Sequence, residues 1–163
     1  MIILFVIYMG VAMPEMVYGA SMYPNFESGE RILVEKVTKH FKEYERGEVV
    51  VLHPPGKEKI DYIKRIIGLP GDIVKIKDCA VYISVDNQKF KLQEEYLPEG
   101  TCTTEGPKIK EGHSMKIDED YYLVLGDNRR ESADSRVFGL VEEDKILGRV
   151  IFRFWPVDRI SFL

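Results

Sequence analysis

The stretch Asp61-Tyr62-Ile63-Lys64-Arg65-Ile66-Ile67-Gly68-Leu69-Pro70-Gly71-Asp72 joins an apolar, β-branched run to a sharp turn signal. Such a run, bounded by Pro-Gly and Asp, predicts a strand that ends in a turn. Lys64 lies in the middle of the run, and three isoleucines accompany it. Alternation along a strand would direct a lysine to solvent, whereas burial would lower its pKa from about 10.4 by up to ~3–5 units. Lys64 is therefore either a surface residue or a candidate general base.

Other short runs of the chain have the same character and the same turn-like boundaries. Strands are expected at Arg31–Val37, Glu48–Leu52, Ile73–Ile76, Ala80–Ser84, Lys89–Leu92, Tyr121–Leu125 and Ile146–Trp155. Asp86 and Asn87 predict a hairpin turn between two of these runs, and Glu142–Lys145 can form one helical turn at most. The sequence therefore predicts a mainly β fold, and its 163 residues fit one compact domain.

Composition excludes little, but the distribution of apolar residues is informative. A net charge of −4 without a basic stripe argues against a nucleic-acid partner. Met1–Met13 is almost wholly apolar, and the first basic residue of the chain is Arg31. A membrane-spanning helix needs about 20 apolar residues, so residues 1–13 predict a short or partial membrane anchor. An ordinary buried strand or helix is the alternative.

A small-residue turn at Gly19-Ala20-Ser21-Met22-Tyr23-Pro24 would leave the Ser21 hydroxyl uncrowded. A serine hydroxyl is a poor nucleophile unless a base lies beside it, and an uncharged Lys64 could be that base. A third segment, Gly126–Arg136, carries charges and hydroxyls more densely than a surface turn requires. The three histidines show no metal-ligand spacing with each other or with the cysteines, so no metal site and no cofactor are expected.

Together and in this order, these segments resemble the type I signal peptidases, the membrane-bound Ser/Lys proteases that remove signal peptides from exported proteins. The resemblance extends from about Pro14 to Trp155. It rests on Ser21–Pro24, Arg46–Val51, Tyr62–Asp72 and Gly126–Arg136. The endoplasmic-reticulum and archaeal type carries histidine at the position of Lys64, so this chain resembles the bacterial type.

The resemblance implies a curled antiparallel sheet or open barrel over residues 14–163, with a variable β-ribbon at about 78–117. It also implies a catalytic domain on the extracytoplasmic face of the plasma membrane, in contact with lipid. Signal-peptide-bearing preproteins would be its substrates, and we expect a monomer. Cys79 and Cys102 fall in the ribbon; an outward-facing domain permits a disulfide, but two distant cysteines do not by themselves predict one.

The implied mechanism uses Ser21 as the nucleophile and neutral Lys64 as the general base. Ser132 matches the serine whose hydroxyl orients the lysine in the family. The Ser21 amide is the natural first donor to the oxyanion. Some members supply a second hydroxyl from the residue two before the nucleophile, but Gly19 stands there, so the second donor is open.

Supporting and substrate-binding residues also follow from the resemblance. The charged pairs Arg65 with Asp127 and Asp134 with Arg136 are expected to hold the shape of the site rather than to transfer protons. Specificity in the family is for small side chains one and three positions before the cut, as in Ala-x-Ala. The matching contacts here are Pro14, Met16, Val17, Tyr18, Asp61, Tyr62 and Ile63.

Two rival classes remain at this point. Self-cleaving repressor-type proteases share the Ser/Lys chemistry, but no helix-turn-helix or cleavable hinge precedes Ser21. A catalytically inactive, membrane-tethered β-domain that binds nascent exported chains is the second rival. The joint presence of Ser21, Lys64 and Ser132 argues against loss of activity. Cleavage of a signal-peptide-bearing precursor would distinguish an active peptidase from such an inactive domain.

Overall fold

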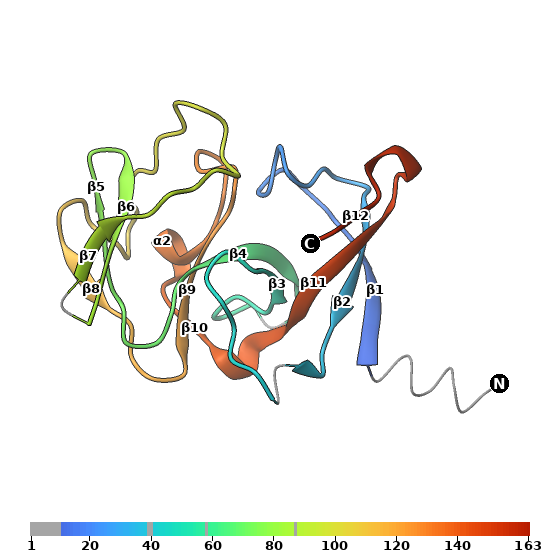
Figure 1. The fold of residues 1–163 in the computed structure, drawn as a ribbon, viewed down its shortest axis with the longest axis horizontal. Coiled ribbons are helices and arrows are strands. Elements are labelled where there is room, and N and C mark those ends of the chain that lie inside the picture. The colour runs from blue at the N-terminus through green and yellow to red at the C-terminus, as the bar shows by residue number, and fades with distance from the viewer. Residues whose placement is uncertain (1–10, 39–40, 58, 87) are drawn as a thin grey trace.

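The structure, a computed structural model, describes residues 11–38, 41–57, 59–86 and 88–163. Two antiparallel sheets make up the fold (Figure 1). The large sheet has the order β1-β2-β11-β3-β4-β9-β10, with β12 paired to β11. Its strands are β1 (Ala12–Met16), β2 (Arg31–Glu35), β3 (Val49–Leu52), β4 (Tyr62–Gly68), β9 (Tyr121–Leu125), β10 (Val141–Glu142), β11 (Ile146–Trp155) and β12 (Ser161–Phe162).

The small sheet has the order β7-β6-β5-β8 and lies at the opposite end of the molecule from β1 (Figure 1). Its strands are β5 (Ile73–Lys77), β6 (Ala80–Val85), β7 (Gln88–Lys91) and β8 (Ser114–Lys116). Three short helices complete the described residues: α2 (Ser135–Phe138), η2 (Glu143–Lys145) and η3 (Val157–Arg159). Residues 92–113 connect β7 to β8 without a regular strand or helix.

The large sheet curls strongly because its long strand β11 is irregular. The pairing of β11 shifts register between Val150 and Phe152 and between Arg153 and Trp155 against β2, and again near Gly148 against β3. Such bulges bend a strand and increase its twist. A Cβ on Gly148 would lie 2.0 Å from the Glu35 carbonyl oxygen, so only glycine allows this close approach of two backbones.

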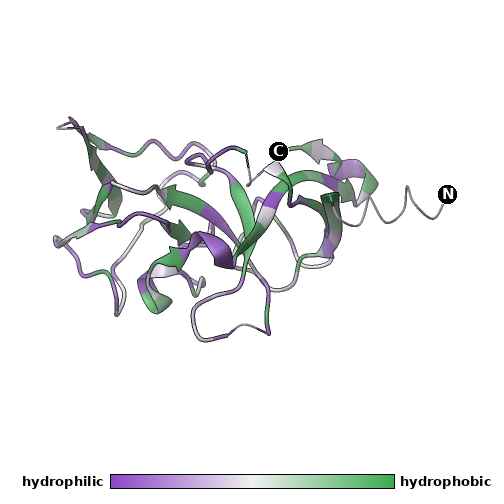
Figure 2. Ribbon diagram, turned by 90° about the horizontal axis from the view of Figure 1, so that it is seen from below, coloured by the Kyte–Doolittle hydropathy of each residue, from purple (hydrophilic) through white to green (hydrophobic). Residues whose placement is uncertain are grey.

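The curled sheet is buried on both faces at β3, whose four residues are all buried. Val49 and Val51 pack into one hydrophobic cluster, which includes Phe26 and Ile32, whereas Val50 and Leu52 pack into another. A strand covered on both faces reads as a continuous apolar run rather than as an alternation. Figure 2 shows hydrophobic residues along the strands of the large sheet. A third cluster joins the small sheet to β9.

The mainly β character and the curled antiparallel sheet are confirmed. The segments β8, β10, β12 and α2 were not expected, because each is short and lacks a clear period. Residues 1–10, most of the expected anchor, lie outside the described residues, and Ala12 and Met13 belong to β1, paired with β2. Within the described ranges, no helix has the length and apolar character needed to span a membrane. Asn87, expected in a hairpin turn, also lies outside the described residues.

Candidate active site

Ser21 and Lys64 lie in hydrogen-bond contact although 43 residues separate them in the chain. Lys64 extends from β4, and Ser21 lies in the turn that follows β1. The Lys64 Nζ atom donates a hydrogen bond to Ser21 Oγ at 2.8 Å and another to the Ile63 carbonyl oxygen at 2.8 Å. The two contacts fix the amine beside the serine hydroxyl, within the distance that a nucleophile and its base require.

The environment of Lys64 favours the uncharged amine. Its side chain does not reach solvent as strand alternation alone would suggest; the residue is only 2% exposed. Burial lowers the pKa of Lys64 to about 8, while the negative charges of Asp134 and Asp127 act in the opposite direction and limit the shift. The nearest aromatic neighbour is Tyr62, whose ring centroid lies 4.9 Å from Nζ. A pKa near 8 suits a general base that works close to neutral pH.

The segment between β9 and α2 is hydrogen-bonded to the turn that contains Ser21. The Asn128 amide donates to the Ser21 carbonyl oxygen at 3.0 Å, and its side-chain Nδ2 donates to the Ala20 carbonyl oxygen at 3.0 Å. Gly126 lies against the same turn: a Cβ on it would stand 2.4 Å from the Ser21 carbonyl oxygen and 2.1 Å from Ser132 Oγ. A glycine is therefore needed where these two segments touch.

Ser132 is close to the pair but does not contact the lysine amine in this structure. Its hydroxyl oxygen is buried and has no hydrogen-bond partner among the described residues. The expected hydrogen bond to Lys64 is absent because Nζ is turned to Ser21 Oγ and the Ile63 carbonyl. A buried hydroxyl without a partner costs about 1–3 kcal/mol, so Ser132 is held in an unsatisfied position near the Ser21 turn.

Both expected ion pairs are formed, and each uses two hydrogen bonds. Arg65 donates to the two carboxylate oxygens of Asp127 at 2.9 and 2.6 Å. Arg136 donates to Asp134 at 2.9 and 2.8 Å, and Asp134 also accepts the Gly126 amide at 3.0 Å and caps α2. Asp127 also accepts a hydrogen bond from Asn25 Nδ2 at 2.8 Å, so the two aspartates connect β4 and the end of β9 to the segment that follows Ser21.

A cleft of about 590 Å³ opens in front of Ser21 and Lys64. Six of the expected substrate contacts line it: Met16, Val17, Tyr18, Asp61, Tyr62 and Ile63. Gly19, at the position of the open oxyanion donor, lines it as well, but Pro14 does not. The sequence reasoning missed Glu15, Ala20, Ile32, Val51, Lys59, Ile60, Glu131 and Ala133.

Strand pairing could have revealed some of the missed residues. Ile32 lines the cleft because β2 pairs with β1 and places Ile32 opposite Glu15. Glu131 and Ala133 belong to the same motif as Ser132 and line the cleft, whereas Ser132 between them does not. Lys59 and Ile60 precede β4 and carried no signal of their own.

Two strand edges border the cleft. β1 is the outermost strand in the order of the large sheet within the described part of the chain. β4 pairs with β9 only from Arg65 onward, so its first residues, Tyr62 and Ile63, have a partner on the β3 side alone. Edges of this kind can accept an added strand from a peptide. The described residues contain no group of three His, Cys, Asp or Glu side chains placed to hold a metal ion.

Comparison with known proteins assigns the family. The model of the family described as signal peptidase, peptidase S26, matches residues 1–155, so the chain belongs to that family. It is a hydrolase of the signal peptidase I type.

The relatives agree with this assignment. Signal peptidase IB of Staphylococcus aureus is 37% identical over 169 residues, covering 99% of this chain and 87% of the relative. The probable signal peptidase I-2 of Synechocystis sp. is 39% identical over 158 residues, covering 94% of this chain and 67% of the relative. The crystal structure of a signal peptidase I from Enterococcus faecalis has a TM-score of 0.53 and 29% identity, covering 67% of this chain and 97% of that one.

Proposed function

We propose that this protein is a membrane-bound serine endopeptidase that cleaves signal peptides from exported preproteins with Ser21 as nucleophile and neutral Lys64 as general base. The observation that carries the proposal is the 2.8 Å contact between Ser21 Oγ and an amine that is 2% exposed. A charged lysine could not accept a proton, and burial is what makes the uncharged form accessible near neutral pH.

The steps follow from this geometry. Lys64 takes the proton of Ser21 as its oxygen attacks the scissile carbonyl carbon, and the resulting ammonium then protonates the leaving amine. The acyl-enzyme is hydrolysed when Lys64 removes a proton from water, and Ser21 recovers its proton as the ester bond breaks. The hydrogen bond to the Ile63 carbonyl keeps Nζ pointed at the serine through these steps.

Ser132 and Gly19 are proposed as supporting residues. The unsatisfied hydroxyl of Ser132 supports a role in orienting Lys64, because a small movement of the amine would give both groups a partner. The Ser21 amide is proposed as the first oxyanion donor. Gly19, with a φ of 81° and no atom within 4 Å of a Cβ built on it, leaves room there for a second donor such as water.

The cleft supports a preference for small side chains of the Ala-x-Ala type. A substrate in β conformation would pair with the free edges of β1 and β4 and insert alternate side chains toward Val17, Ile32 and Ile63. The branched side chains of Ile32 from β2 and Ile63 from β4 line the cleft and limit its width. Bulky side chains next to the cut would therefore be excluded.

An extracytoplasmic location at the plasma membrane and contact with lipid are also proposed. The Cys79–Cys102 disulfide supports an oxidising compartment. Met16 and Tyr18, on the β1 side of the cleft, are 38% and 77% exposed, and such side chains suit a surface that rests on a bilayer. We propose that the enzyme acts there as a monomer.

The test is cleavage of a signal-peptide-bearing precursor in detergent micelles. We expect a cut after Ala-x-Ala by the wild type and none by Ser21→Ala or by Lys64→Ala. A precursor with a bulky residue directly before the cut should stay intact. If either variant cleaves as fast as the wild type, the assignment of these two residues is wrong; if no precursor is cut, the inactive β-domain that binds exported chains becomes the better description.

A further inference from the structure

Residues 92–104, here called the strap, have no part in the proposed mechanism. The strap connects the small sheet to the segment 126–130, which contacts the Ser21 turn. Its start is bound to β6 by the Leu92 amide, which donates to the Val81 carbonyl at 2.9 Å. Its end is bound by the disulfide between Cys79 and Cys102 and by the Thr103 amide, which donates to the Cys79 carbonyl at 3.1 Å. The strap has no regular secondary structure of its own, so attachments of this kind hold it in place; between its two ends, the Tyr96 carbonyl oxygen accepts a hydrogen bond from Asn25 Nδ2 at 2.8 Å.

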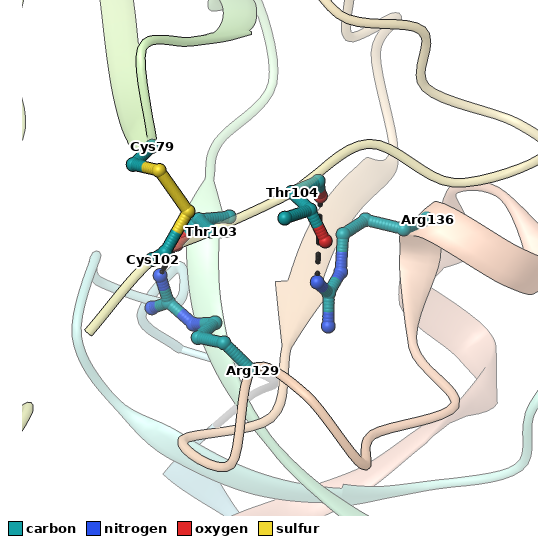
Figure 3. Close-up of a disulfide and its surroundings, with 6 residues drawn as sticks. All are labelled: Cys79, Cys102, Thr103, Thr104, Arg129 and Arg136. Carbon is teal, nitrogen blue, oxygen red and sulfur yellow. Dashed lines mark hydrogen bonds between the residues drawn. A yellow bond between two sulfur atoms is a disulfide. The ribbon is translucent and has the colours of Figure 1, made fainter.

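The strap contacts two buried arginines of the segment 126–136: Arg136 donates to the Thr104 carbonyl oxygen at 3.4 Å, and Arg129 is held more extensively. Arg129 is 3% exposed, and its guanidinium bonds to both carboxylate oxygens of Glu94, one of them at 3.0 Å, and to the Thr103 hydroxyl. Figure 3 shows the guanidinium reaching toward Thr103, directly beside the disulfide. Two strap residues therefore satisfy most of the donors of this side chain.

The same guanidinium also reaches back into the segment that supports Ser21. Arg129 Nε donates to the Gly126 carbonyl oxygen at 3.0 Å. Gly126 touches the Ser21 carbonyl and Ser132, and the next residue but one, Asn128, bonds the Ser21 carbonyl with its amide. A continuous set of contacts thus runs from the disulfide through Thr103 and Arg129 to the backbone of the nucleophile.

We propose that Arg129 is a positioning residue for the Ser21–Lys64 pair and that it acts only while the Cys79–Cys102 disulfide holds the strap in place. The proposal rests on the roles of Ser21 and Lys64 proposed above. Removing the disulfide frees Thr103 and Glu94, loosens Arg129, and lets the segment around Gly126 move away from the serine turn. No strap residue lines the described cleft, so the effect falls on the chemical step and not on substrate binding.

The bond is accessible to a reductant, because Cys79 is exposed and Cys102 is partly exposed. Dithiothreitol reduces it by thiol–disulfide exchange. The reductant loses two hydrogens and closes to a cyclic disulfide, while the two cysteine sulfurs each gain one hydrogen as their mutual bond breaks. Oxidised wild type, reduced wild type and a Cys79→Ser/Cys102→Ser variant then provide three states of the same strap.

The first experiment measures kcat, KM and the pH dependence of kcat/KM for these states and for Arg129→Lys and Arg129→Gln, with a signal-peptide-bearing precursor. We expect kcat to fall about 10- to 100-fold without the disulfide or in Arg129→Gln, because small misplacement of reacting groups is costly, and KM to change little. The pH at which kcat/KM reaches half of its maximum should increase by about half a pH unit or more, because water that reaches Lys64 raises its pKa. Arg129→Lys should recover part of the loss, and reductant should leave the serine double variant unchanged.

Arg149 provides a matched control. It is also a buried arginine in an ion pair, bonded to Glu48 at 3.0 Å, but it contacts neither the strap nor the serine turn. Arg149→Gln should lower the melting temperature without moving the pH profile. The proposal is overturned if the Arg129 and disulfide variants, like Arg149→Gln, lower the melting temperature without moving the pH profile. It is also overturned if the reduced wild type keeps both its kcat and its pH profile.

A second readout does not depend on activity and separates this proposal from the proposed function. Hydrogen exchange should become at least about tenfold faster at the Gly126 and Asn128 amides on reduction, because exchange reports local opening, while the amides of β2 stay protected. Unchanged exchange at these amides refutes the inference even if the enzyme cleaves precursors. Faster exchange supports the structural link from the disulfide to the Ser21 turn even if the cleavage assignment fails.

Discussion

The protonation of Lys64 gives the sharpest quantitative prediction for this enzyme. With a pKa of about 8, roughly one tenth of the lysine is uncharged at about pH 7. With the ordinary value of about 10.5, the uncharged fraction would be roughly 300 times smaller. We therefore expect kcat/KM to rise about tenfold per pH unit below about pH 8 and to level off above it.

The same pKa predicts a change in stability, which can be measured without any substrate. Lys64 has a pKa of about 8 in the folded chain and of about 10.5 in the unfolded chain. Between these two pH values the unfolded state therefore binds more protons than the folded state. Stability from this group therefore rises with pH through that window. Below it, folding carries a penalty of about 3 kcal/mol for burying the charged amine.

Comparing wild type with Lys64→Met isolates this contribution, because all other titrating groups are shared. The free energy of unfolding of the wild type, relative to the variant, should increase by about 2 kcal/mol between about pH 7 and about pH 9.5. Urea unfolding followed by tryptophan fluorescence measures it through the single Trp155. A difference that stays constant over this range, together with a kcat/KM that still climbs at its upper end, would refute the argument that burial deprotonates the lysine.

Three further predictions concern the neighbours of the pair. Gly126→Ala should reduce cleavage by about 100-fold or more and destabilise the fold by ~1–3 kcal/mol, since its Cβ would stand 2.4 Å from the Ser21 carbonyl oxygen; precursor cleavage and thermal unfolding measure both effects. Asp127→Asn should shift the rise of kcat/KM to lower pH, because a negative charge that raises the pKa of Lys64 is lost, and should cost ~3–5 kcal/mol by leaving Arg65 without its partner. Ile63→Ala should allow cleavage of precursors with a larger residue beside the cut, as tested by competition between matched precursors; unchanged selectivity would show that this side chain does not narrow the cleft.

Much of the site could be predicted because its parts are local motifs. The apolar strand made Lys64 a candidate that only the combination with the other motifs favoured over a surface lysine, and the density of charge after β9 indicated Asp127 and Asp134. The pairing that brings them together was not readable from periodicity, because the approach of Ser21 to Lys64 depends on how β1, β2 and β11 curl. The bulges that produce the curl involve single residues such as Gly148, and a single residue leaves no period.

The disulfide and the strap show where sequence reasoning reaches its limit. Cys79 and Cys102 are 23 residues apart, and nothing in their spacing distinguishes a bond from two free thiols. Their pairing is decided by the small sheet, which brings the end of β5 next to a segment without regular structure. Arg129 was indistinguishable from the adjacent Arg130 in the sequence, yet only the first is buried.

The ion pairs solve a conflict that any buried lysine base faces next to carboxylates. Asp127 and Asp134 bond the segment that contacts the Ser21 turn, but their charges favour the ammonium form of Lys64 and so oppose its proposed role as general base. Each aspartate is bonded in bidentate fashion to an arginine, Arg65 or Arg136, which supplies a compensating positive charge at close range. Opposite charges so close together act on a third group mainly as a dipole, whose field falls off faster than that of a single charge. Burial can then outweigh the two carboxylates in setting the pKa of Lys64. The ion pairs are retained, and the amine can still act as the proposed base.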